Sequence, residues 1–208
     1  MPLSYRHPRT GEWAHDVRDP LGEARWVFYA PAAAARPPRS GADLAILEIG
    51  FGRGFNTAIA LAELGAGARA HGILAVGYEP FPEAAAPWPD CPPSLAASAP
   101  WWGQCTGSWE LSPGVRVEVR RERAAAGMRA RRERFDWIFL DLYSPARHPE
   151  DWEPDLFVAL AEAARPGAVL TSYCTARTLR AGLQGTGWQV HKRSNPGRRD
   201  TLAAVYPL

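Results

Sequence analysis

The stretch "LEIGFGRGFN", residues 47–56, leads from an apolar run into glycine at every second position, at Gly50, Gly52 and Gly54. Glycine permits positive φ angles and lets the backbone approach a neighbour that any Cβ atom would block. In a parallel α/β sheet, the turn after the first strand lies against the cofactor. The stretch therefore predicts a ligand site at the end of a buried strand.

Strand and helix patterns alternate around this stretch. Apolar or alternating runs predict strands at residues 44–49, 72–79, 115–119, 135–142 and 168–174. Periodic apolar residues predict helices at residues 56–64, 154–164 and 178–184, and an antiparallel strand pair is expected at 188–193 and 202–206. We therefore expect an α/β fold with a mostly parallel sheet and helices on both faces.

Two parts of the chain depart from this regularity. Residues 1–43 predict an N-terminal β-hairpin and linker, because aromatic and branched residues between Trp13 and Tyr29 flank a turn at Pro20–Gly22. Residues 44–208 form the main domain. Within it, residues 80–113 are rich in Pro, Trp, Ser and Ala and predict an irregular, partly helical insertion.

The composition is that of a globular protein, with 46% hydrophobic and 22% charged residues in 208. No stretch is apolar over the length that a membrane span needs, so we expect a cytoplasmic protein without a membrane partner. Three cysteines, Cys91, Cys105 and Cys174, lack a Cys-x-x-Cys spacing, which favours reduced thiols and no metal site.

The basic residues are unevenly placed, although the net charge is only +2. Residues 116–134 hold eight arginines against three glutamates, and residues 177–199 hold six basic residues without Asp or Glu. Such local excess suits an anionic partner.

The spacing of the glycines separates two kinds of cofactor. A dinucleotide-binding G-x-G-x-x-G pattern needs a glycine at 55 or 57, where this chain has Phe55 and Thr57. The pattern present, E-x-G-x-G-x-G from Glu48, resembles the S-adenosylmethionine loop of class I methyltransferases. Glu79 ends the second strand, where a carboxylate can accept hydrogen bonds from both ribose hydroxyls of a nucleoside.

The segment "FDWIFLDLYSPARHPEDW", residues 135–152, carries a closer resemblance. It is similar to the F-L-D-x-F-S/A-P-x-x-N-P-x-x-W pattern of the MnmC-type tRNA-modifying methyltransferases, with Asp141 at the end of a buried strand. "GFGRGFN" resembles the family's G-F-G-T-G-L-N, the N-terminal segment contains matching His15 and Glu23, and "HKRSNPGRRDTL" is similar to its basic tail. The resemblance covers most of the chain and is weakest over residues 80–113.

The resemblance implies a class I, Rossmann-like methyltransferase that binds S-adenosyl-L-methionine and methylates the 5-aminomethyl group of the tRNA wobble uridine. The chain resembles the stand-alone methyltransferase form, which needs an aminomethyl substrate that another enzyme makes. The implied cofactor-binding residues are Glu48, Gly50, Phe51, Gly52, Gly54, Asn56, Glu79, Glu122 and Asp141.

This chain departs from the family pattern at the end of the third core strand. The family has Gly-Asp-Ala there, and its Asp is implied to bind the adenine amino group, whereas this chain has Glu122-Arg123-Ala124. Arginine cannot accept a hydrogen bond. Glu122 can substitute for that Asp after a small register change, adenine can be held by backbone and stacking, or cofactor binding is weakened. Of these we expect Glu122 to substitute. Tyr143 and His148 replace the family's usual Phe and Asn.

Asp141 is the expected catalytic residue, because a carboxylate can orient an alkylamine and accept its proton. It can instead cap the loop before Pro145 or contact the cofactor's amino group. Aromatic faces stack on nucleobases and basic side chains contact phosphates. The candidate substrate-binding residues are Tyr143, Ser144, Pro145, Trp152, Tyr173, Lys192, Arg193, Arg198 and Arg199.

Other functions remain compatible with the sequence. The chain can be a methyltransferase of the same fold that acts on another RNA or on a small amine. An aminopropyltransferase is disfavoured because Asp141 is followed by Leu, Tyr, Ser and Pro, with no adjacent acids. A noncatalytic RNA-binding module that has lost cofactor binding also remains compatible, because Arg123 replaces the expected acidic residue.

Overall fold

The structure is a computed structural model that describes residues 4–7, 10–39, 41–68, 72–80, 90–104, 106–195 and 197–208. In this part of the chain, eight strands form one sheet in the order β3-β4-β2-β1-β5-β6-β8-β7. The strands are β1 (Leu44–Ile49), β2 (Ile73–Tyr78), β3 (Gly107–Ser112), β4 (Val115–Arg120), β5 (Phe135–Leu140), β6 (Ala164–Ser172), β7 (Gln189–Arg193) and β8 (Thr201–Val205).

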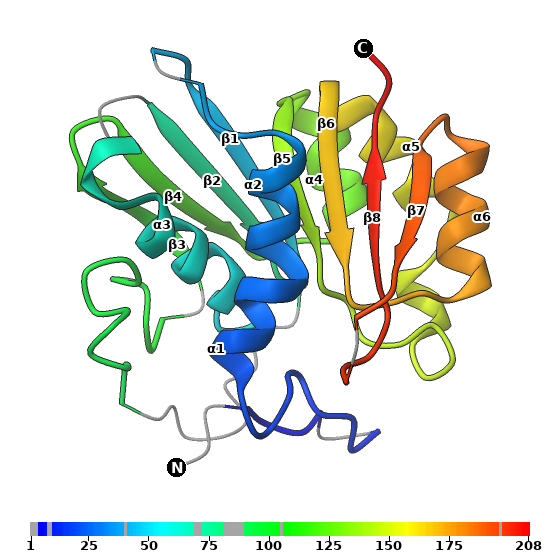
Figure 1. Cartoon of the computed structure of the whole chain (residues 1–208), viewed down its shortest axis with the longest axis horizontal. Helices are drawn as coiled ribbons and strands as arrows, with labels where there is room; N and C mark the ends of the chain where they lie inside the picture. The colour runs from blue at the N-terminus through cyan, green and yellow to red at the C-terminus, as the bar shows by residue number, and fades with distance from the viewer. Residues whose placement is uncertain are drawn as a thin grey trace.

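The centre of the sheet is parallel and buried. Strands β4, β2, β1, β5 and β6 run in one direction, and every residue of β1 and β5 is buried. Such continuous apolar runs are typical of parallel strands covered on both faces. Figure 1 shows the sheet face-on, with β8 inserted antiparallel between β6 and β7 at one edge. The predicted mostly parallel sheet and its antiparallel C-terminal pair are confirmed.

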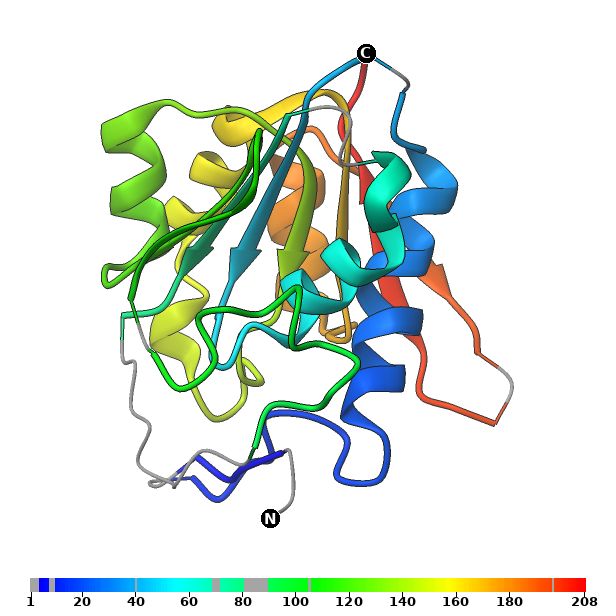
Figure 2. The ribbon, with the colours of Figure 1, turned by 90° about the vertical axis from the view of Figure 1, so that its left-hand side faces the viewer.

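Helices cover both faces of the sheet (Figure 2). One core cluster packs α3 (Phe55–Ala68) and the N-terminal helical segment against one face, through residues such as Phe28 and Ile59. The other cluster packs α4 (Ala124–Arg131), α5 (Pro154–Ala163) and α6 (Arg177–Gly185) against the opposite face, through residues such as Leu160 and Leu183. A short 3-10 helix, η2 (Pro149–Asp151), precedes α5.

The predicted N-terminal β-hairpin is wrong. Residues 20–35 are helical throughout, as α1 (Pro20–Glu23), the π-helical η1 (Ala24–Tyr29) and α2 (Ala30–Ala35). Asp19 caps the first turn by accepting a hydrogen bond from Gly22, and Pro20 is well placed at the first helical position. Ala24, Val27, Phe28 and Ala32 are buried, which is helical spacing. The only β pairing described before residue 44 is an isolated bridge between Arg6 and Trp13.

The irregular insertion predicted for residues 80–113 needs correction at its end. Gly107–Ser112 is an edge strand that pairs antiparallel with β4, so the irregular region is shorter than expected. Residues 81–89 and 105 lie outside the described residues. Helix α4 was not predicted, because its run of arginines and alanines lacks a clear apolar stripe.

Cys91 and Cys174 are free thiols, as expected, whereas Cys105 lies outside the described residues. Among the helices that the structure describes, none combines the length and apolar character needed to cross a membrane.

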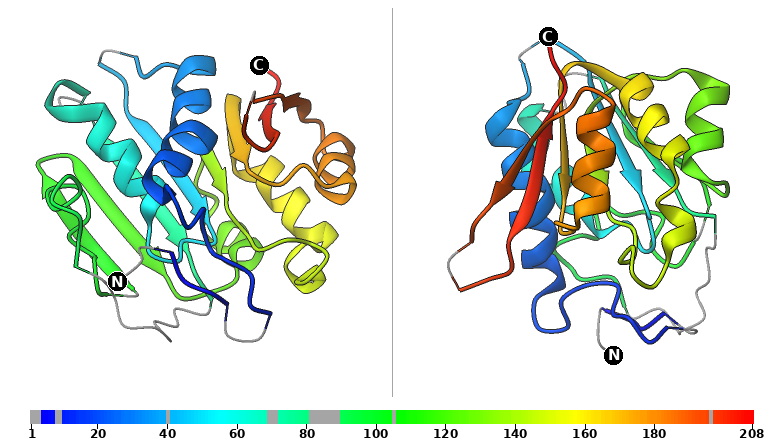
Figure 3. Two further views of the ribbon diagram at one scale, coloured as in Figure 1. Left: turned by 60° about the horizontal axis from the view of Figure 1, so that its bottom comes forward. Right: turned by 90° about the vertical axis from the view of Figure 1, so that its right-hand side faces the viewer.

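The carboxyl ends of β1, β2 and β5 point toward one end of the molecule. The described residues before helix α1, 4–7 and 10–19, form the N-terminal segment, which lies across that end, as the left view of Figure 3 shows. The C-terminus lies at the opposite end (Figures 1 and 2). The predicted ligand end of the sheet is therefore covered by described residues that precede helix α1.

Candidate active site

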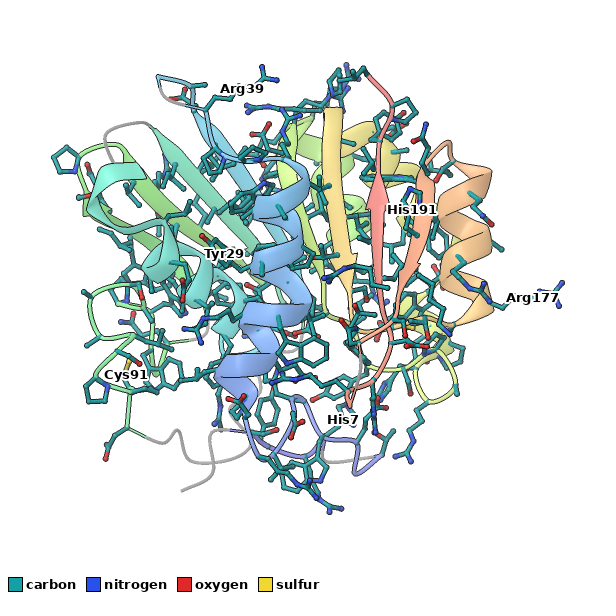
Figure 4. All side chains as sticks on the ribbon, in the orientation of Figure 1. His7, Tyr29, Arg39, Cys91, Arg177 and His191 are labelled. Carbon is teal, nitrogen blue, oxygen red and sulfur yellow. The ribbon has the colours of Figure 1, made fainter. Side chains whose placement is uncertain are left out.

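A cavity of about 450 Å³ lies beyond the carboxyl ends of β1, β2 and β5. Figure 4 labels one of its wall residues, His7, in the N-terminal segment at the lower end of the molecule, and Arg39 at the opposite end. The wall is formed by Tyr5, His7, Ala14, His15, Gly50, Gly52, Glu79, Pro80, Arg123, Asp141, Leu142, Tyr143, His148, Glu150, Asp151 and Tyr173.

The glycine loop and the end of β5 are in direct contact. Gly50 has a φ of 79°, and a Cβ atom there would lie 2.3 Å from the carbonyl oxygen of Asp141. The backbone N–H of Asp141 donates to the carbonyl of Ile49 at 2.8 Å. Only glycine allows the chain after β1 to bend against the chain after β5 in this way. The loop and the carboxylate therefore face the same cavity.

A buried network connects the start of α3 to Asp141. Glu48 accepts hydrogen bonds from the backbone N–H and hydroxyl of Thr57 and from the side-chain amide of Asn56. The same Asn56 amide donates to Oδ2 of Asp141 at 2.8 Å. Burial raises the pKa of Glu48 to about 7, against the lowering effect of these hydrogen bonds. Glu48 and Asn56 thus hold the loop and the Asp141 carboxylate in place from behind the cavity.

Glu79 fastens the glycine loop from the neighbouring strand. Its Oε2 atom accepts a hydrogen bond of 2.9 Å from the backbone N–H of Gly52. Phe51 turns away from the cavity, is 2% exposed, and packs against Gly77 and Trp101. The loop therefore presents its backbone to the cavity beside the Glu79 carboxylate and buries its aromatic side chain.

Asp141 is a buried carboxylate, with 5% of its side chain exposed. Burial raises its pKa well above the ordinary value, and the nearby Glu23 and Glu48 act in the same direction, while the Asn56 hydrogen bond lowers it. A raised pKa makes a carboxylate a better proton acceptor near neutral pH. Asp141 is therefore suited to exchange a proton with a group in the cavity.

The N-terminal segment forms one wall of the cavity and is tied to the loop after β5. Glu12 accepts hydrogen bonds from the backbone N–H and the hydroxyl of Ser144, at 3.0 and 2.9 Å. The hydroxyl of Thr10 is 3.2 Å from Nε2 of His148. The ring of Tyr5 lies under the Arg53 guanidinium, 4.7 Å from it. These contacts close the cavity on the side that the sheet leaves open.

The structure brings six of the residues predicted from the sequence to the cavity wall. These are Gly50, Gly52, Glu79, Asp141, Tyr143 and Tyr173. A shallower groove shares Tyr173 with the cavity and is lined by Ser144, Pro145, Ala146, Cys174, Thr175, Ala176, Thr178, Arg199 and Asp200. Tyr173 donates a hydrogen bond to the carbonyl of Leu142, which fixes it between the two hollows.

Other predicted residues lie away from the cavity. Trp152 is 4% exposed and donates to the carbonyl of Tyr143 from the core, so the predicted stacking on a base is not what its position supports. Lys192 pairs with Asp200 at 2.6 Å, and Arg198 lies over the ring of Trp26. The remaining predicted residues outside the cavity wall are Glu48, Phe51, Gly54, Asn56, Glu122 and Arg193.

The predicted role of Glu122 meets a difficulty in the structure. Glu122 pairs with Arg131 at 2.7 Å and does not line the cavity, whereas Arg123 does. Arg123 lies 3.4 Å from the carboxylate of Asp151, which also lines the cavity. Acceptor oxygens at this end of the cavity therefore come from the η2 region, on Glu150 and Asp151.

Sequence reasoning missed the wall residues Tyr5 and His7 and gave His15 no role. One weak signal for these residues was available. The N-terminal segment resembles that of the MnmC-type family, and its polar and aromatic residues lack the apolar pattern of a core element.

Comparison with known proteins places the chain in a family. Residues 100–207, just over half of the chain, match the family described as S-adenosyl-L-methionine-dependent methyltransferase. The chain belongs to this family of S-adenosyl-L-methionine-dependent methyltransferases.

Particular relatives carry a more specific name. The chain is 33% identical to the "tRNA 5-methylaminomethyl-2-thiouridine biosynthesis bifunctional protein MnmC" of Delftia acidovorans, over 96% of this chain and 33% of that protein. It is 30% identical to the protein of the same name from Aeromonas salmonicida, over 88% of this chain and 31% of that protein. The chain thus spans about a third of the length of these relatives.

A solved structure shares the fold. The crystal structure of MnmC2 from Aquifex aeolicus superposes with a TM-score of 0.83 at 22% identity, over 99% of this chain and 68% of that one.

The residues of the cavity fit a nucleoside cofactor in most respects. Gly50 and Gly52 line the cavity without a side chain, and Glu79 offers carboxylate oxygens at the end of β2. Among the described wall residues, Arg123 is the one that departs from the expected set, because an acidic hydrogen-bond acceptor is expected there.

Replacing Gly50 by alanine tests the contact between the loop and β5. Gly41 has a similar φ of 80° but no described heavy atom within 4 Å of a Cβ position, so Gly41→Ala is the matched control for backbone strain. We expect Gly50→Ala to lower the free energy of unfolding by about 2 kcal/mol more than the control. Cofactor affinity, measured by calorimetry, should fall at least about tenfold in Gly50→Ala only. Equal effects of the two substitutions would contradict the contact.

The buried Asp141 predicts a pH-dependent stability. The folded protein holds the Asp141 proton more tightly than the unfolded chain does. The contribution of this carboxyl group to the free energy of unfolding therefore falls as pH rises through the raised pKa. Asp141→Asn keeps an oxygen that accepts the hydrogen bond from Asn56, and it removes the destabilisation caused by a buried ionised carboxylate. We expect Asp141→Asn to raise the free energy of unfolding on the order of 1 kcal/mol at neutral pH, and to leave it unchanged near about pH 3. Denaturant titration at both pH values measures the difference, and a gain of the same size at both would refute the burial argument.

Proposed function

We propose that this chain transfers a methyl group from S-adenosyl-L-methionine to the nitrogen of the 5-aminomethyl group on the wobble uridine of tRNA. The observation that carries the proposal is the single cavity shared by the glycine loop and the Asp141 carboxylate. The names of the relatives supply the substrate, and the family supplies the methyl donor.

The cofactor is proposed to lie along the glycine loop. Backbone at Gly50 and Gly52 would accommodate it, and Glu79 would accept hydrogen bonds from its ribose. Glu150 and Asp151 offer acceptor oxygens for an amino group at the Arg123 end of the cavity, in place of Glu122. When bound, S-adenosyl-L-methionine supplies an electrophilic methyl group.

Asp141 is proposed to prepare the acceptor nitrogen. An alkylamine is mostly protonated at neutral pH, and the protonated form lacks the lone pair that attacks a methyl group. Asp141 can bind the ammonium group and accept its proton, and Asn56 holds the carboxylate in one orientation. Tyr143 and Tyr173 line the same space, where a uracil ring can stack. Alignment of the uncharged amine then supplies much of the rate enhancement.

The groove beside the cavity is the proposed path of the RNA backbone. It shares Tyr173 with the cavity and contains Arg199. The β7–β8 connection that carries Arg198 and Arg199 lies at the same end of the sheet as the N-terminal segment (Figure 1). Basic side chains there can contact phosphates and position the tRNA without reading its sequence.

The decisive test is product formation. The protein is incubated with S-adenosyl-L-methionine and tRNA that carries 5-aminomethyluridine, and the nucleosides are analysed by mass spectrometry. We expect a methylaminomethyl nucleoside with the wild-type protein and a loss of at least about 100-fold in rate with Asp141→Ala, because the acceptor keeps its proton. Transfer of a labelled methyl group onto a pool of small amines, with none onto tRNA, would contradict tRNA as the substrate and favour a small amine instead.

Charge reversal in the groove tests the RNA path. Arg199→Glu should weaken tRNA binding at least about tenfold at low salt and reduce the salt dependence of binding, while cofactor binding stays unchanged. Arg39→Glu is the matched control, because Arg39 is exposed at the opposite end of the molecule (Figure 4). Filter binding or fluorescence anisotropy measures both variants, and equal affinities would remove Arg199 from the RNA path.

A further inference from the structure

His15 lies between two carboxylates at the back of the candidate active site. Its Nδ1 atom is 3.8 Å from Oδ2 of Asp141 and 3.7 Å from Oε2 of Glu23. The imidazole packs edge-on against Phe55, with the ring centroids 4.9 Å apart. One imidazole nitrogen therefore faces both the carboxylate after β5 and a carboxylate on α1.

Exposure to solvent increases along this row of side chains. It rises from 5% at Asp141 to 7% at His15 and 19% at Glu23. During the proposed reaction, cofactor and acceptor fill the cavity in front of Asp141, so a proton accepted there has no open path through the cavity. His15 lines the cavity beside Asp141, whereas Glu23 does not and is the most exposed of the three.

We propose that His15 and Glu23 form the route by which Asp141 passes the acceptor's proton to solvent. The inference rests on the proposed function and deepens it. His15 is a positioning residue in this scheme, because it acts through Asp141. A movement of about 1 Å brings Nδ1 into hydrogen-bond distance of either carboxylate.

The proton transfers balance without another reactant. The acceptor ammonium gives its proton to the Asp141 carboxylate and keeps the electron pair of that N–H bond as its attacking lone pair. Asp141 then gives the proton to Nδ1 of neutral His15 and becomes a carboxylate again. The imidazolium gives the proton to the Glu23 carboxylate, and water removes it from there.

The charges around the row favour release of the proton from His15 over its retention, so the imidazolium is a short-lived state in this scheme. Burial and the Arg53 guanidinium lower the pKa of His15 to about 4, so the imidazole is neutral and returns a proton readily. Burial raises the pKa of Glu23, which makes it a competent acceptor. The other ionisable groups that act on these three residues are Glu48, Asp16, Asp19 and Arg199.

The experiment compares His15→Gln and Glu23→Gln with wild type in single-turnover methyl transfer to aminomethyluridine-bearing tRNA across pH. Near pH 7 we expect the rate to fall about 10- to 100-fold in His15→Gln and less in Glu23→Gln. Toward about pH 10 the loss should disappear, because the amine then loses its proton without help. Cofactor affinity, measured by calorimetry, should stay at the wild-type value in Glu23→Gln, because Glu23 does not line the cavity. His191→Gln and Glu63→Gln serve as controls, since both side chains are exposed and lie outside the site.

The outcomes separate the two proposals. If wild type gives no methylaminomethyl product, the proposed function fails. If wild type is active but the two variants keep its rate near pH 7, or lose rate equally at every pH, the relay is refuted.

A second measurement does not depend on turnover. In ¹⁵N NMR spectra near neutral pH, the Nδ1 signal of His15 should move in Asp141→Asn and in Glu23→Gln, and stay in place in Glu63→Gln. An unmoved signal in the first two variants would also overturn the relay, whatever the substrate proves to be.

Discussion

The close contact between the Gly50 α-carbon and the Asp141 carbonyl determines the geometry of the site. Two parallel strands, β1 and β5, end side by side, and their following segments have to diverge or touch. Glycine at residue 50 lets them touch, because a Cβ atom would lie 2.3 Å from the carbonyl oxygen. The glycine loop and the Asp141 carboxylate are thereby held on the wall of one cavity, with Asn56 and Glu48 bonded behind them.

The first residues of the chain complete this site. Tyr5, His7 and His15 supply part of the cavity wall, and Glu12 ties the segment to Ser144 in the loop after β5. Helix α1 adds Glu23 close to His15. Acids that are distant from Asp141 in the sequence thus gather near it in space. The absence of acids immediately after Asp141 therefore says little about the charge of the acceptor site.

Much of the fold and part of the site could be predicted from the sequence. Continuous apolar runs such as Leu44–Ile49 and Phe135–Leu140 are typical of strands at the centre of a sheet covered on both faces. Residues that follow parallel strands meet at one edge of the sheet. That reasoning is sufficient to bring Gly50, Glu79 and Asp141 together.

The failures have physical reasons. Trp26, Val27, Phe28 and Tyr29 favour strand locally, but tertiary packing of a helical face overrides this preference. Aromatic residues do not reveal which face they present, so Trp152 in the core and Tyr173 at the cavity looked equivalent. The proximity of His15 to Asp141 joins residues more than a hundred positions apart, which no local pattern encodes.

The central claim is that one cavity seats a methyl donor along Gly50–Gly52 and faces the Asp141 carboxylate toward the acceptor. A crystal structure of the protein with S-adenosylhomocysteine tests it most directly. We expect the ribose at Glu79, the main chain of the glycine loop against the ligand, and the sulfur directed toward Asp141. A ligand bound elsewhere, or a cavity that stays closed by Tyr5 and His15 at saturating ligand, would contradict it.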